Sequence, residues 1–127
     1  QLYANPYYVT DETLAEHRDK VDAMMRVSAK GWGWVHENQE QACEFLVERY
    51  PNLDLASELK AVPLVDGYSF NAVTAKSGWG TMTRENWQAQ IDAYASLGQF
   101  DGEPPKVDDM MTLSVLEATA ADRPKFG

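Results

Sequence analysis

The stretch KGWGWVHENQEQA, residues 30–42, decides the fold of this 127-residue chain because two amphipathic segments meet in it. Apolar residues recur at helical spacing over residues 21–35 and again, over a shorter run, over residues 42–46. Asn38 lies between the two segments. A short polar side chain there can end one helix and cap the next by accepting a bond from an unpaired backbone N–H. We therefore predict a long helix, a tight turn near Asn38, and a second helix packed against the first.

Two glycines lie inside the predicted long helix, Gly31 and Gly33, each beside a tryptophan. A glycine in a helix interior costs about 1 kcal/mol relative to alanine. We expect this cost to be offset by the close approach of another backbone element to this face of the helix.

Composition indicates one globular domain with an acidic, solvated surface. Hydrophobic residues make up 44% of the chain and charged residues 24%, which is typical of a folded domain. The formal net charge of -9 argues against binding to nucleic acid and to anionic membranes, both of which require basic surface. We therefore predict no nucleic-acid partner.

Cys43 is the only cysteine, so the sequence offers no internal disulfide, and we interpret the residue as a buried, inert thiol. No apolar run approaches the roughly 20 residues of a membrane helix. No signal peptide is recognisable, and the first residue is Gln1 rather than methionine. We interpret the chain as a processed product, a deliberately shortened protein or a fragment.

The N-terminal residues 1–9 are rich in aromatic and β-branched side chains, which predicts an extended strand. Pro6 cannot donate a ladder hydrogen bond and belongs at an edge or a bend. Thr10 is followed by acidic residues, which the helix dipole favours in a first turn. We predict a short helix capped by Thr10 and ending near His17.

The middle of the chain predicts two more helices separated by an irregular stretch. Asp54 is placed to cap the first of these, and Pro63 is expected to end or kink it. Residues 66–80 are interrupted by glycine, serine and asparagine. Within them, residues 70–73 fit either a short strand or an irregular packed loop. Thr83 then caps a well-marked helix.

The C-terminal third predicts one last helix. Gly98 stands where a left-handed residue ends the preceding helix, and residues 101–106 form a loop. Thr112 is placed to cap the final helix, and residues 120–127 have the composition of a tail. The predicted chain is therefore mainly α, with one N-terminal extended strand followed by about five helices.

No local pattern of catalytic or metal-ligating residues is present. His36 and the residues after it resemble a zinc-protease helix superficially, but Glu40 stands where the second histidine of that motif belongs. We therefore interpret His36 as a surface histidine with satisfied hydrogen bonds. No glycine-rich phosphate loop and no neighbouring Ser-His-Asp or Cys-His arrangement is found. We predict no catalytic residue, no metal site and no cofactor.

Aromatic residues are the remaining candidates for a binding site. Trp32 and Trp87 occupy apolar helix faces and are expected in the core. Trp79 lies between two glycines, and Tyr3 and Tyr7 lie in the extended N-terminal segment, so these three are better placed to meet a ligand.

Several short motifs, in this order, give the chain a resemblance to a known family. They are Leu2-Tyr3-Ala4-Asn5, Thr10-Asp11-Glu12, the stretch 30–42, Gly80-Thr81-Met82-Thr83-Arg84-Glu85-Asn86-Trp87-Gln88 and Leu97-Gly98. From about Leu2 to Leu116 the chain resembles the C-terminal part of bacterial ABC-transporter solute-binding proteins of the NMT1/THI5-like group. These proteins have two α/β lobes of the type II periplasmic-binding-protein fold, joined by crossing strands.

The resemblance implies a division of the chain into parts of one single unit. Residues 1–9 correspond to a crossing strand, residues 10–119 to the helical completion of lobe one, and residues 120–127 to a tail. The N-terminal half of the protein, with the main sheet, is then absent from this chain.

The resemblance also implies a function. The protein would be the substrate-binding component of an ABC import system, capturing a small solute by hinge closure. Solutes of the group are thiamine-pyrimidine precursors, riboflavin, taurine and other sulfonates. The implied partners are an ABC permease and the missing N-terminal half, and the implied location is periplasmic or membrane-anchored and extracytoplasmic. Tyr3 and Asn5 are expected near the cleft, with Tyr7 and Trp79 as further ligand contacts.

Two alternatives stay open at this point. Some relatives are enzymes that synthesise the thiamine pyrimidine, although the expected role here is not enzymatic. That chemistry requires a cysteine-rich motif and a reactive histidine, which the family carries in the missing half. A stand-alone helical interaction module is the other alternative, and it predicts that the chain folds alone without exposed apolar surface.

Overall fold

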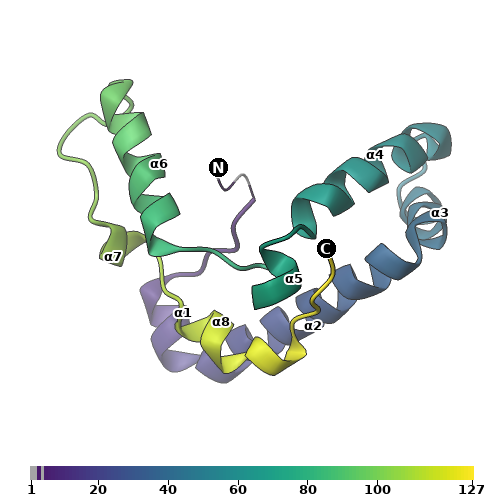
Figure 1. Cartoon of the computed structure of the whole chain (residues 1–127), viewed down its shortest axis with the longest axis horizontal. Helices are drawn as coiled ribbons and strands as arrows, with labels where there is room; N and C mark the ends of the chain where they lie inside the picture. The colour runs from purple at the N-terminus through teal and green to yellow at the C-terminus, as the bar shows by residue number, and fades with distance from the viewer. Residues whose placement is uncertain (1–2, 4) are drawn as a thin grey trace.

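The computed structural model describes residue 3 and residues 5–127, and the prediction of a mainly helical chain is confirmed. Helices account for 65% of the residues that the structure describes, and none of these residues lies in a strand. In chain order the elements are α1 (Asp11–Glu16), α2 (Arg18–Glu37), α3 (Gln39–Arg49), α4 (Leu55–Ser69), α5 (Thr74–Ser77), α6 (Arg84–Ser96), α7 (Val107–Met110), α8 (Ser114–Ala118) and the 3-10 turn η1 (Ala120–Asp122). Figure 1 shows them as an open arrangement, with α6 and α7 on one side, α3 and α4 on the other, and α1, α2 and α8 below.

The predicted N-terminal strand is wrong for the residues that the structure describes. Asn5 lies at a bend and residues 6–10 have no regular secondary structure. A strand requires a neighbouring strand for its ladder hydrogen bonds, and the helical elements offer none. Tyr3 instead donates its backbone N–H to the side chain of Gln90, at 3.0 Å. The predictions for Gln1, Leu2 and Ala4 lie outside the described residues.

Helices α1 and α2 follow the sequence prediction closely. Thr10 caps α1, because its hydroxyl oxygen accepts a bond from the Thr13 backbone N–H at 3.1 Å. The join at Asn38 between α2 and α3 is confirmed, but its predicted role as an N-cap is wrong. The Asn38 amide donates to the Trp34 carbonyl at 2.9 Å, so it satisfies the end of α2 rather than the start of α3.

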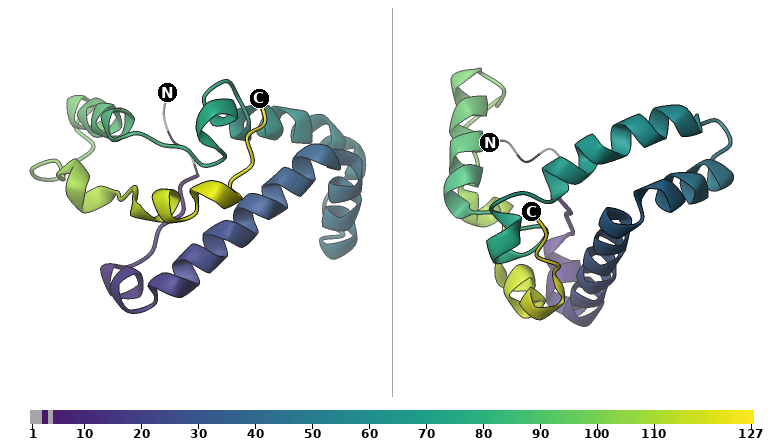
Figure 2. Two further views of the ribbon diagram at one scale, coloured as in Figure 1. Left: turned by 60° about the horizontal axis from the view of Figure 1, so that its bottom comes forward. Right: turned by 45° about the vertical axis from the view of Figure 1, so that its right-hand side comes forward.

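Helix α3 packs mainly against α4 rather than against α2, which corrects the predicted pairing (Figure 2). Cys43 is buried, with 3% of its surface exposed, as expected. The direction of α3 explains the difference, because the chain turns at Asn38 and leads α3 away from α2. Only the part of α3 next to Asn38 then remains close to α2.

Helix α4 continues through Pro63, so of the two predicted outcomes, an end or a kink of the helix, the end is wrong. Proline removes one intrahelical hydrogen bond, but the helical turns before and after Pro63 are intact, and α4 ends only at Ser69. Asp54 caps this helix as predicted, accepting from the Ser57 N–H at 2.8 Å. Residues 70–73 form bends and turns, so of the two predicted alternatives the irregular loop is correct and the strand is wrong. Phe70 is buried, and the short helix α5 follows.

The C-terminal third is also close to expectation. Thr83 caps α6 by accepting from the Asn86 N–H at 3.2 Å, and Gly98 adopts the predicted left-handed conformation, with φ of 65°. The short helix α7 was not predicted. In α8, Val115 and Leu116 are buried. The prediction that Thr112 caps this helix is wrong, because Leu113 is the N-cap and makes no side-chain cap bond. The Thr112 hydroxyl lies one residue earlier and accepts from the Ser114 N–H at 3.2 Å.

The open arrangement leaves a large surface. The solvent-accessible area is 8932 Å², whereas a compact monomer of 14.3 kDa exposes about 6,800 Å². The difference, about 2,100 Å², exceeds what one partner contributes to a standard protein interface, about 800 Å². Large apolar side chains account for part of it, since Tyr8, Val27, Leu64 and Tyr68 are each more than 60% exposed.

Candidate functional site

The main cluster of the molecule is aromatic, and Trp79 is at its centre. Gly78 and Gly80 flank it with φ of 89° and 77°, a conformation that side-chain-bearing residues rarely adopt, so the loop can turn the indole inward. Trp79 is 7% exposed and stacks on Trp32 with ring centroids 6.3 Å apart. Tyr7 of the N-terminal segment meets Trp79 edge-on, at 6.1 Å and 70°.

Residues from α2 and the end of α4 complete this cluster. Ala29 and Phe70 are buried beside Trp79. The His36 ring stacks on Phe126 with centroids 4.4 Å apart, and it lies edge-on to Phe70 at 4.9 Å. Its Nδ1 is 2.9 and 3.0 Å from the two carboxylate oxygens of Asp66. A carboxylate only accepts, so this pairing places a hydrogen on Nδ1. His36 is therefore hydrogen-bonded, as the sequence indicated, but it is half-buried in the aromatic cluster and is not the predicted surface histidine.

The C-terminal residues hold the Trp79 loop in place. One guanidinium nitrogen of Arg123, Nη1, donates to the carbonyls of Gly78 and Trp79, at 3.2 and 2.8 Å, and to the Thr81 hydroxyl at 3.2 Å. The Trp79 N–H donates to the Pro124 carbonyl at 2.8 Å. Burial lowers the pKa of Arg123 from its ordinary value. Residues 120–127, predicted as a tail, thus run along α2 and contact the aromatic cluster (Figure 2).

The expected close approach to the glycines of α2 is found at one of them. A Cβ added to Gly33 would lie 3.1 Å from Pro124 Cγ, so the C-terminal segment packs directly on that glycine. A Cβ added to Gly31 would meet nothing within 4 Å.

Tyr3 belongs to a second, separate cluster on α6. Its hydroxyl accepts from the Thr83 N–H at 2.9 Å and from the Asn86 amide at 3.2 Å. Its ring lies 5.4 Å from Trp87, and its backbone N–H bonds the nearly buried Gln90 side chain. These contacts fix the N-terminal segment to α6, so Tyr3 is an anchor of that segment.

The structure brings together two of the four predicted ligand contacts. Tyr7 and Trp79 touch, while Tyr3 packs on Trp87 and Asn5 is exposed at the bend between the two tyrosines. Tyr7 is 55% exposed and is the accessible member of the pair, with Trp79 buried behind it. Sequence reasoning missed the residues that surround Trp79: Trp32, which it assigned to the core alone, and Phe70, His36 and Phe126. No local pattern could have joined them to Trp79, because they come from three separate segments.

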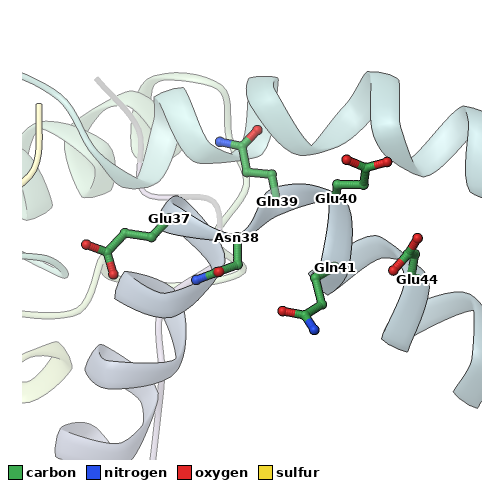
Figure 3. A pocket seen from close by; sticks show the side chains of 6 residues that line it. All are labelled: Glu37, Asn38, Gln39, Glu40, Gln41 and Glu44. Carbon is green, nitrogen blue, oxygen red and sulfur yellow. The ribbon is translucent and has the colours of Figure 1, made fainter.

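An open hollow lies at the join of α2 and α3, and none of the predicted contacts lines it. Its lining residues are Glu37, Asn38, Gln39, Glu40, Gln41 and Glu44. Figure 3 shows these side chains pointing in different directions rather than converging on one point. Among residue 3 and residues 5–127, no group of three or more histidine, cysteine or acidic side chains is placed to hold a metal ion.

A family model described as NMT1/THI5 like matches residues 1–42, which cover the N-terminal segment, α1, α2 and the start of α3. Searches of curated proteins and of solved structures gave no match. In the part of the chain that the structure describes, no helix has the length and apolar character needed to cross a membrane.

Proposed function

We propose that this chain is part of the solute-binding component of an ABC import system and that Tyr7 contacts the solute. The observation that carries the proposal is the family match over residues 1–42, because it contains the segment that presents Tyr7. A role in solute binding is compatible with that family, and so is a relationship to the synthase. The aromatic cluster supports the first of these, since Tyr7 offers an exposed ring held by a buried one.

The proposed mechanism is closure of two lobes over a small, flat or anionic solute. Aromatic rings present large rigid surfaces to such ligands at low entropic cost. The N-terminal segment is the connection between lobes, anchored to α6 by Tyr3 and to the Trp79 loop by Tyr7. Asn5, exposed between these anchors, supplies an amide to the solute. The preceding half of the protein contributes the facing lobe and the sheet, and an ABC permease receives the solute outside the cytoplasmic membrane.

The large surface of this chain supports the presence of a facing lobe. An excess of about 2,100 Å² over a compact monomer indicates that the helices cover something further in the assembled protein. The enzymatic alternative finds no support in Cys43. Burial and the nearby charge of Glu58 raise the pKa of its thiol, whereas a reactive cysteine requires a lowered one.

Calorimetric titration with a thiamine-pyrimidine precursor, riboflavin and taurine tests the proposal. It should be made on the longest native polypeptide that contains these 127 residues. One of these probes should bind, and Tyr7→Ala should weaken it about tenfold, which corresponds to the loss of about 1.4 kcal/mol. Tyr8→Ala is the matched control, because Tyr8 is the next residue and is 92% exposed. Absence of binding by all three probes, or equal affinities of the two variants, would refute the proposal.

A further inference from the structure

Helix α2 is apolar on two opposite faces, and only one of them is covered. Met25, Ala29 and Trp32 lie on the inner face and belong to the aromatic cluster. Met24, Val27 and Trp34 lie on the other face, at spacings of three and seven residues, and are 58, 67 and 39% exposed. A surface helix normally has a single apolar stripe. The second stripe of α2 therefore indicates a surface that another element covers.

Gly31 lies in the middle of this outer stripe and supports the same conclusion. A glycine inside a helix costs about 1 kcal/mol relative to alanine. For Gly33 the packing of Pro124 at 3.1 Å explains the choice of residue, but nothing lies near Gly31. A small residue at the centre of an exposed apolar stripe is what close approach of a second helix requires.

We infer that the outer stripe of α2 packs against the same stripe of a second copy, with the two helices antiparallel. Met24 and Trp34 lie equally far from Ala29 along the chain, and so do Val27 and Gly31. A two-fold axis level with Ala29 therefore sets Val27 against the partner's Gly31 and Met24 against the partner's Trp34. Val27 then packs over a glycine that has no side chain, and Met24 packs on an aromatic ring. A symmetric interface needs this complementarity between a surface and its own copy.

The charges at the two ends of the stripe are complementary in this arrangement. Lys20 continues the stripe at its N-terminal end, while the C-terminal end carries Glu37 and Glu40. None of the three forms an ion pair among the described residues. An antiparallel partner brings Lys20 of each copy to the acidic end of the other. The net charge of -9 opposes association at long range, but physiological salt screens it beyond about 8 Å.

The stripe is extended by a second exposed ring. Phe45 of α3 is 53% exposed and stacks on Trp34, with centroids 5.9 Å apart and planes within 6° of parallel. Aromatic residues at the core of an interface commonly dominate its binding energy. Trp34 and Phe45 are therefore the expected anchors at each end of the two-fold interface.

The test is the mass in solution, at about 0.15 M salt, of the longest native polypeptide that contains these 127 residues, measured by light scattering after gel filtration over a range of concentrations. The wild type should have twice the mass that the same polypeptide has when denatured. Val27→Glu should raise the dissociation constant about 30-fold or more. Leu64→Glu is the matched control, because Leu64 is 68% exposed on α4, and it should leave the dimer unchanged.

A charge exchange keeps the inference falsifiable if Val27→Glu does not fold. Lys20→Glu and Glu37→Lys should each weaken the dimer, and the double exchange should restore it. A wild-type mass equal to that of the single denatured polypeptide, a complex with a different polypeptide on this face, or equal dissociation by the two glutamate variants would overturn the inference. None of these results depends on solute binding, so the proposed function is tested separately.

Discussion

Replacing Phe126 with alanine tests whether the C-terminal segment is part of the fold. Complete burial makes a Phe→Ala change cost about 3–5 kcal/mol. Phe126 is partly buried against the core cluster, so we expect a loss of about 2–3 kcal/mol. Its partners account for this value, since the ring stacks on His36 at 4.4 Å and meets Phe70 edge-on at 5.3 Å. Each aromatic contact contributes about 0.5–1.5 kcal/mol beyond the buried area.

Urea unfolding followed by circular dichroism measures this loss. With a slope of about 2 kcal/mol per molar urea, the midpoint should fall by about 1–1.5 M with no change in slope. Lys125→Ala is the control, because Lys125 is the neighbouring residue and is exposed. A Phe126→Ala midpoint within about 0.2 M of that control would refute the reasoning and would show that residues 120–127 behave as a tail.

Two further predictions concern titratable groups. Hydrogen bonds from the Ser57 side chain and backbone lower the pKa of Asp54 in the folded chain. The stability that the ionised Asp54 carboxylate contributes is therefore fully present above its unfolded pKa of about 3.9. That stability is lost as the pH falls through the lower folded pKa. Asp54→Ala should therefore lower the urea midpoint at pH 7 but not at a pH below the folded pKa, and equal losses at both pH values would contradict this. Burial and the charge of Glu58 raise the pKa of Cys43, so a thiol reagent should label the native chain far more slowly than the urea-unfolded chain. Equal labelling rates would show that the thiol is accessible.

Helix boundaries were predictable where a single side chain determines them. Thr10, Asp54 and Thr83 each precede a helix and each accepts the expected backbone hydrogen bond. These signals are local, because donor and acceptor are three residues apart. Gly98 is predictable for the same reason, since its left-handed conformation is a property of one residue.

The errors occurred where the outcome depends on distant residues. The N-terminal segment has strand-forming composition, but strand formation requires a partner strand, and Tyr3 instead bonds Gln90, 87 positions away. Pro63 carries a local helix-breaking signal, yet α4 continues through it, so the turns on both sides outweigh the lost bond. Asn38 can act at either neighbouring helix end, and sequence alone does not show that it bonds Trp34.

The candidate site was predictable only in part for the same physical reason. Tyr7 and Trp79 were chosen because one lies in an extended segment and the other between glycines, and these are local features. Their contact with each other depends on Arg123, whose guanidinium fixes the Trp79 loop from the far end of the chain. The role of the C-terminal segment is therefore to hold the Trp79 loop in the position where Tyr7 packs on it. If Tyr7 binds solute, the residues after η1 belong to the binding site as its support, because Arg123 fixes the Trp79 loop on which Tyr7 packs.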